Sequence, residues 1–211
     1  QLPSWRVYNL GVGGYGTNQV YAQLSSDALE DEIGRDSGTG VYVFIDDHLF
    51  RNIGSMRVYN LWGRDMPYYC VEGDGLKRKG TFTTGRRWRS FIYNLLGKSR
   101  MLKCAGFDWP KAGPEDLLLT ARLIRGCADA FHNKFPGSRF VVVFYPGSKF
   151  APQLIELLKA EGGQGLVILD YSRLFDRKDR RFVIEGDGHP SAFANQTLAG
   201  QLIKDLGVAA H

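Results

Sequence analysis

Four apolar runs, rich in β-branched and aromatic residues, alternate along this chain with segments of helical pattern. The apolar runs cover residues 6–12, 40–48, 138–148 and 165–172. Since they are nearly continuous, they predict strands that are buried on both faces, as in a parallel sheet. The helical patterns cover residues 17–32, 114–135, 149–161 and 191–206. This alternation predicts a doubly wound α/β domain with right-handed crossovers.

Length and composition narrow the class of protein. A chain of 211 residues suits one domain, here residues 1–211, better than two small ones. Hydrophobic residues make up 44% of the chain, which is enough for a core and argues against general disorder. No apolar run is long enough to span a bilayer, and no signal peptide is visible. The three cysteines, Cys70, Cys104 and Cys127, fit no zinc spacing, and their odd number excludes full disulfide pairing.

Residues 49–110 break the alternation of strands and helices, because they carry glycines, aromatics and arginines without a clear period. We predict that they form an insertion after the strand at 40–48. Loops at the carboxyl ends of parallel strands surround the ligand crevice, so the insertion would form a wall or cap there. The sequence "RVYNL" occurs twice, at 6–10 and 57–61. We interpret the repeat as coincidence, or at most as two similar short strands.

A basic stretch, residues 77–103, contains lysines and arginines throughout but no Asp or Glu. Trp88, Phe91 and Tyr93 lie among these cations. Such a pattern can hold nucleic acid or an anionic glycan. It is more often a solvated face or a surface near a membrane, so we expect no nucleic-acid partner.

A glycine turn, with glycines at positions 11, 13, 14 and 16, follows the first apolar run and precedes a helical pattern. The spacing overlaps the dinucleotide-binding fingerprint. The acid that should end the next strand could only be Asp46 or Asp47, which lie too far along the chain. A glycine turn at a helix start can instead point backbone N–H groups at a developing oxyanion.

Polar residues also follow the second apolar run, in the order Asp46, Asp47, His48. They are consistent with loop capping, with a polarising group in a cleft, or with a metal site completed by His189. A further acid and base lie close together near the C-terminus, as Asp187 and His189. This pair is either a turn histidine with a nearby Asp, or an Asp that orients a catalytic base.

These three segments, in this order, resemble the motif blocks of the SGNH (GDSL-like) hydrolase superfamily. The resemblance implies a three-layer α/β/α fold with a flavodoxin-like parallel sheet. It also implies that Gly14 donates its backbone N–H to an oxyanion hole, and that Asp187 and His189 are the acid and base of a triad. His48 is the nearest residue to the place of the family's oxyanion asparagine, with Asp47 beside it. Asp47 and Arg51 would line the wall of the site.

The nucleophile of this family is a serine in a Gly-Asp-Ser block, which follows the first strand and precedes the glycine turn. Asp36 and Ser37 imitate this block, but they precede a strand. We therefore expect the first strand and the serine upstream of Gln1. The strands at 6–12 and 40–48 would otherwise lack a central partner. Direct pairing of 6–12 with 40–48 would contradict this expectation.

The predicted function is that of a serine-type ester hydrolase acting on an acyl or acetyl ester. Its substrate would be a small molecule or a carbohydrate, and the chemistry requires no metal and no organic cofactor. Two alternatives stay open: an O-acyltransferase that acts on a polysaccharide, and a non-catalytic homologue that binds a ligand. The identity of the ester and the oligomeric state are open. A secreted or periplasmic location is favoured over a cytoplasmic one.

Overall fold

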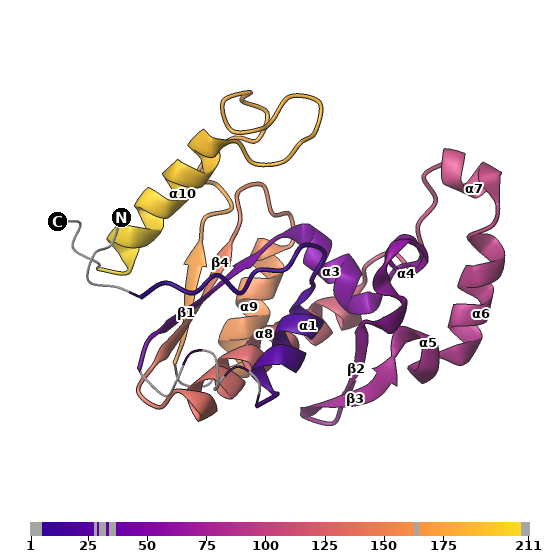
Figure 1. Ribbon diagram of the computed structural model, residues 1–211, viewed down its shortest axis with the longest axis horizontal. Helices are drawn as coiled ribbons and strands as arrows, with labels where there is room; N and C mark the ends of the chain where they lie inside the picture. The colour runs from indigo at the N-terminus through magenta and orange to yellow at the C-terminus, as the bar shows by residue number, and fades with distance from the viewer. Residues whose placement is uncertain (1–5, 28, 30–32, 34–36, 163–164, 208–211) are drawn as a thin grey trace.

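A parallel sheet of three strands lies at the centre of the molecule, in the order β1-β4-β5 (Figure 1). The computed structural model describes residues 6–27, 29, 33, 37–162 and 165–207. The strands are β1 (Thr39–Phe44), β4 (Arg139–Phe144) and β5 (Leu166–Asp170). They confirm three of the predicted strands and a mixed α/β fold. The apolar run at 40–48 is strand only up to Phe44, because its polar end begins a helix.

The central strand β4 is buried on both faces, as its continuous apolar sequence predicts. Val141, Val142, Val143 and Phe144 are each fully buried. One face of the sheet packs against α8 (Pro114–Lys134) and α9 (Ala151–Glu161), and the other packs against α10 (Ala192–Asp205). The molecule therefore has helices on both faces of the sheet, which is compatible with α/β/α layering.

Three of the predicted helices are confirmed by α8, α9 and α10. The helix predicted over residues 17–32 is not continuous, because α1 spans Thr17–Leu24 and a turn follows it. Leu29 is helical again, and residues 28 and 30–32 lie outside the described residues. Ser25, Ser26 and Asp27 form the turn after α1, and the Ser26 hydroxyl donates to the carbonyl of Gln23 at 2.8 Å. Small polar side chains that bind nearby backbone in this way compete with helix continuation.

The strand predicted over residues 6–12 is wrong, since this segment has no regular secondary structure. Val7 is 75% exposed and Val12 is 50% exposed, whereas Leu10 is partly buried against the core. Within the described residues, β1 pairs with β4 and not with this segment. An extended segment without a hydrogen-bonded neighbour does not form a strand, whatever its β propensity.

Residues 54–110, which lie within the predicted insertion, fold into short helices and a hairpin on one side of the sheet (Figure 1). The helix before them, α3 (Asp46–Ile53), takes up the first residues of the predicted insertion. The elements that follow are α4 (Met56–Leu61), η1 (Gly63–Asp65), β2 (Pro67–Glu72), β3 (Gly75–Thr81), α5 (Phe82–Gly85), α6 (Arg87–Leu96) and α7 (Arg100–Cys104). The hairpin β2-β3 packs against α1 and α8 through Tyr69, Leu76 and Leu123.

The second "RVYNL", at 57–61, lies in helix α4, so the interpretation of two similar strands is wrong. Ser55 caps this helix, because its Oγ accepts from the Val58 N–H. Val58 and Tyr59 are buried in a cluster with Tyr93. Across the described residues, no helix has the length and apolar character needed to cross a membrane.

Candidate active site

Polar side chains from three segments gather at the carboxyl edge of the parallel sheet. The first segment is the start of α3, directly after β1, and the second is the turn after β4. The third is the long loop between β5 and α10 (Figure 1). In open α/β sheets this edge is where ligands bind, so it is the natural place for a site.

Asp46 joins the first two of these segments. Its Oδ1 accepts from the Ser148 hydroxyl at 2.6 Å, and its Oδ2 accepts from the Lys149 backbone N–H at 2.9 Å. Both carboxylate oxygens are therefore occupied by the turn after β4. Asp46 therefore holds the start of α3 against the turn after β4. It was also considered as a metal ligand, but among the described residues it belongs to no group of three side chains that could hold a metal.

Asp187 and His189 lie together, as their spacing predicts. The carboxylate Oδ1 of Asp187 is hydrogen-bonded to Nδ1 of His189, and it also accepts from the His189 backbone N–H at 3.3 Å. This bond lowers the pKa of Asp187, so the carboxylate is ionised at neutral pH. Because Asp187 holds Nδ1, Nε2 of His189 is left to exchange a proton with a substrate. The His189 side chain is 77% exposed.

The loop that carries this pair is a tight hairpin. A bridge joins Val183 to Pro190, and the Ile184 N–H donates to the His189 carbonyl at 2.8 Å. Gly186 and Gly188 flank Asp187 with φ values of 79° and 76°, a region that favours glycine. The hairpin therefore fixes the backbone of the Asp-His pair directly before α10.

Gly14 forms a second part of the candidate site, with a φ of 85°. Nε1 of Trp62 donates to the Gly14 carbonyl at 3.2 Å, and Arg51 donates to the Tyr15 carbonyl at 2.7 Å. Asp47 lies 3.9 Å from Arg51 in an ion pair. No described residue accepts a hydrogen bond from the Gly14 N–H, as an oxyanion donor requires. The structure thus brings Gly14, Asp47 and Arg51 together.

His48 is held in a polar network beneath the same turn. Its Nδ1 lies 2.7 Å from the Tyr42 hydroxyl, which lies 2.8 Å from the Thr17 hydroxyl. Nδ2 of Asn52 donates to Oγ1 of Thr17 at 3.0 Å and to Oγ1 of Thr120 at 3.1 Å. Burial and the charge of Arg51 lower the pKa of His48 to about 3, so this imidazole is neutral at pH 7.

The network also fixes which nitrogen of His48 carries the proton. The fully buried Thr17 hydroxyl accepts from Asn52, so its own proton is free for Tyr42. Tyr42 then donates to Nδ1 of His48. This direction gives a partner to each of the two buried hydroxyl protons, whereas the reverse leaves that of Thr17 without one. His48 therefore carries its proton on Nε2, which suits the predicted role as an oxyanion donor.

The structure does not connect all the predicted residues. No contact described here joins Gly14 or His48 to Asp187 or His189. Ser37 is exposed and lies two residues before β1, at the amino edge of the sheet. A strand of six residues, about 20 Å long, separates that edge from the carboxyl edge. Ser37 is therefore excluded as the partner of His189, and Asp36 lies outside the described residues.

The structure does not support the alternatives of a metal site or a dinucleotide-binding site. The described part of the chain contains no group of three His, Cys, Asp or Glu side chains that could hold a metal. The dinucleotide fingerprint needs a strand before its glycines, and residues 6–12 do not form one. Cys70, Cys104 and Cys127 are free thiols.

The sequence analysis did not identify several residues that support this edge. Trp62 supports the Gly14 turn, Ser148 binds Asp46, and Arg177 donates to the Gly188 carbonyl at 2.9 Å. Each lies far along the chain from the residue it contacts, or in a loop without periodicity. No local pattern could have identified them.

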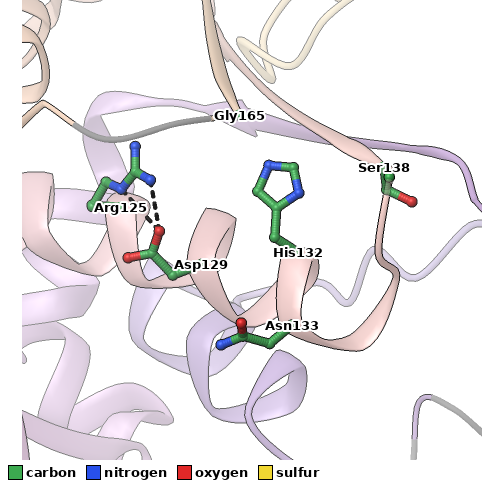
Figure 2. Close-up of a pocket in the computed structure, with 7 residues that line it drawn as sticks. Arg125, Asp129, His132, Asn133, Ser138 and Gly165 are labelled. Carbon is green, nitrogen blue, oxygen red and sulfur yellow. Dashed lines mark hydrogen bonds and ion pairs between the residues drawn. The ribbon is translucent and has the colours of Figure 1, made fainter.

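A cavity of about 510 Å³ lies near the amino edge of the sheet, away from the polar side chains described above (Figure 2). It is lined by residues that include Arg125, Asp129, His132 and Gly165. Arg125 and Asp129 form an ion pair at 2.7 Å, and the His132 ring points toward Gly165. None of the predicted catalytic or oxyanion residues lines this cavity, so the carboxyl edge remains the candidate site.

The basic stretch is partly structural. Arg86 is buried and donates to the carbonyls of Ile53 and Gly54, and its burial lowers its pKa to about 10. On α6, Trp88 is 75% exposed and Phe91 is 58% exposed, and their rings stack at 5.8 Å. The stretch thus combines a cation of the core with an open aromatic face. The absence of a nucleic-acid partner stays a prediction.

Comparison with known proteins adds no relative. The chain matches no family model, and neither the curated proteins nor the solved structures contain a match.

Proposed function

We propose that this protein is a serine-type ester hydrolase with the fold and triad of the SGNH hydrolases. The observation that carries the proposal is the hydrogen-bonded pair of Asp187 and His189 at the carboxyl edge, on the hairpin that precedes α10. The parallel order β1-β4-β5 and the Gly14 turn beside α3 are consistent with it. Acyl or acetyl esters are the proposed substrates.

In the proposed reaction, Nε2 of His189 removes the proton of a serine hydroxyl as that oxygen attacks the acyl carbon. Asp187 holds the imidazole and stabilises its charged form. The N–H of Gly14 and Nε2–H of His48 hold the oxyanion. His189 then gives the proton to the leaving alcohol, and water repeats the sequence to release the acid.

Among the described residues no serine contacts His189, so the proposal places the attacking serine outside them, on the strand that the resemblance puts beside β1. Among the described ladders, β1 pairs only with β4, so its other edge is free to receive a strand. Ser148 is a serine at the carboxyl edge, but its hydroxyl donates to Asp46 and not to a histidine. Ser191 donates to the Arg181 carbonyl.

Labelling with a fluorophosphonate tests the proposal on the natural full-length protein, because this reagent modifies serines activated by a base. We expect the label on a serine outside the described residues, with hydrolysis of 4-nitrophenyl acetate. His189→Ala should abolish labelling, and Asp187→Asn should lower the rate about 10⁴-fold. Asp129→Asn, at the amino edge, is the matched control and should keep the rate.

Two results would count against the hydrolase. A protein without label and without acetate release is not a serine esterase. Release of acetate that survives in His189→Ala assigns the chemistry to another base. Preferential transfer of acetyl to an added sugar alcohol, with slow release to water, would point to the acyltransferase alternative.

A further inference from the structure

A cavity of about 650 Å³ adjoins the hairpin that carries Asp187 and His189. Its walls come from the turn after β4, from the loop after β5 and from the tip of the hairpin itself, where Gly188 contributes. Four cationic side chains are among the lining residues, and the lining carboxylate is that of Asp176. The cations are Lys149, Arg173, Arg177 and Lys178.

Arg177 is fixed in place by three contacts. Its guanidinium lies 6.0 Å from the centre of the Tyr145 ring, and Nη2 donates to the Gly188 carbonyl at 2.9 Å. Its side-chain stem covers Gly147, where an added Cβ would lie 2.9 Å from Cδ. Arg177 therefore joins the turn after β4 to the hairpin tip, so that the cavity wall and the Asp187 backbone are held together.

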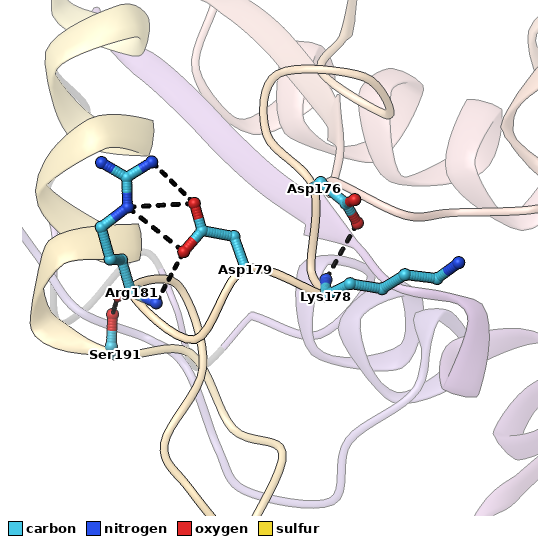
Figure 3. Close-up of polar contacts among 5 residues, drawn as sticks. All are labelled: Asp176, Lys178, Asp179, Arg181 and Ser191. Carbon is cyan, nitrogen blue, oxygen red and sulfur yellow. Dashed lines mark hydrogen bonds and ion pairs between the residues drawn. The ribbon is translucent and has the colours of Figure 1, made fainter.

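The carboxylate among these lining residues, that of Asp176, accepts a backbone hydrogen bond. Oδ1 of Asp176 accepts from the Lys178 backbone N–H at 2.9 Å, while the Lys178 ammonium extends away from it (Figure 3). The next carboxylate along the loop, that of Asp179, is held by Arg181 with Nη2 at 2.6 Å from Oδ2 (Figure 3). Because four cations and one carboxylate are among the lining residues, the lining carries an excess of positive charge.

We propose that this cavity binds an anionic group, a carboxylate or a phosphate, on the substrate whose ester is attacked by the serine that His189 activates. The inference rests on the proposed function, because it assigns a substrate class to that site. Arg and Lys side chains that converge from two loops recognise such groups through charge-assisted hydrogen bonds. The cavity also lies at the carboxyl edge of the sheet, where α/β proteins place their ligands.

Binding can be tested without turnover, by calorimetry on the natural protein. The probes are galacturonate, glucose 6-phosphate and the neutral sugar galactose. We expect at least one charged probe to bind about tenfold more tightly than galactose, and more weakly as salt is added. The variant Arg173→Gln/Lys178→Gln should lower this affinity about tenfold or more. Lys98→Gln/Lys159→Gln removes the same charge elsewhere and should leave the affinity unchanged.

Equal binding of all three probes, no binding of either charged probe, or equal loss in both double variants would overturn the proposal. The preferred charged probe tells whether the group is a carboxylate or a phosphate. A protein that binds the charged sugars but takes no fluorophosphonate label contradicts the esterase alone. A labelled protein that does not distinguish galacturonate and glucose 6-phosphate from galactose contradicts the anionic cavity alone.

Discussion

At the scale of single residues, two histidines of this protein differ because of what surrounds them. His189 is exposed and its imidazole is oriented by one carboxylate two residues away. His48 is oriented by the Tyr42 hydroxyl and lies largely covered between helix and sheet. The first is suited to gain and lose a proton, and the second is suited to remain a neutral donor.

The low pKa of His48 makes stability depend on pH. The ordinary value for the unfolded chain is 6.5, whereas burial lowers the folded value to about 3. Between these values only the unfolded chain binds a proton at this site, so acid favours unfolding. We expect the free energy of unfolding to fall as pH is lowered from 6.5 towards 3. The contribution of His48 is about 1 kcal/mol per pH unit.

Urea unfolding between pH 7 and pH 4 measures this slope. The variant His48→Gln has no imidazole to titrate, so its slope should be flatter than that of the natural protein. Asn133→Gln, at an exposed position of α8, changes no titratable group and should keep the natural slope. Identical slopes for His48→Gln and the natural protein would show that His48 is not protected from protonation.

At the scale of elements, α3 is the helix that connects the parts of the candidate site. Asp46 at its start binds the turn after β4, and Arg51 in its last turn binds the Tyr15 carbonyl. Asn52, the next residue, is buried and donates to Thr17 of α1 and to Thr120 of α8. Because α3 is bonded both to the core helices and to the Gly14 turn, it fixes the positions of that turn and of His48 relative to the core.

Replacing Asn52 by alanine should destabilise this junction. Its side chain donates to Thr17 and Thr120, and its Oδ1 accepts from the Asn18 N–H at 3.1 Å. Asn52→Ala leaves these buried groups without partners, so we expect a loss of about 2–4 kcal/mol in the free energy of unfolding. Asn133→Ala, on the exposed side of α8, should change it by less than about 0.5 kcal/mol. Equal effects of the two variants would contradict the role of Asn52.

At the scale of the whole molecule, the parallel sheet is the stable centre and the first described segment is not part of it. β4 lies between two strands and its four last residues are fully buried. The segment 6–12 is largely exposed, and β1 does not pair with it. Opening of this segment therefore exposes little apolar surface, whereas exposure of β4 requires opening of the domain.

Hydrogen exchange should follow this difference. We expect the amides of 140–145 to exchange most slowly of those described, and those of 6–12 to exchange among the fastest. Mass spectrometry of peptic fragments measures both in one experiment on the natural protein. Protection of 6–12 equal to that of β1 would mean that this segment is hydrogen-bonded in a strand, and it would contradict the arrangement described here.

Elements with a strong local signal could be predicted from the amino-acid sequence. The strands at 138–148 and 165–172 follow from continuous apolar runs, and α8 follows from Pro114 at its start and the pattern after it. The pairing of Asp187 with His189 was also predictable, since two residues on one hairpin are neighbours in any fold. These features depend on short stretches of chain, so their physical causes are local.

Other features depend on contacts between distant parts of the chain and could not be predicted in this way. The same five residues, "RVYNL", are irregular at 6–10 and helical at 57–61, so their own propensities did not choose between the two. A capping serine and a buried cluster select the helix at the second copy, while at the first copy β1 supplies no hydrogen bonds. Likewise, the protonated nitrogen of His48 and the positive cavity beside His189 depend on contacts between residues far apart in the chain, which only the folded molecule creates.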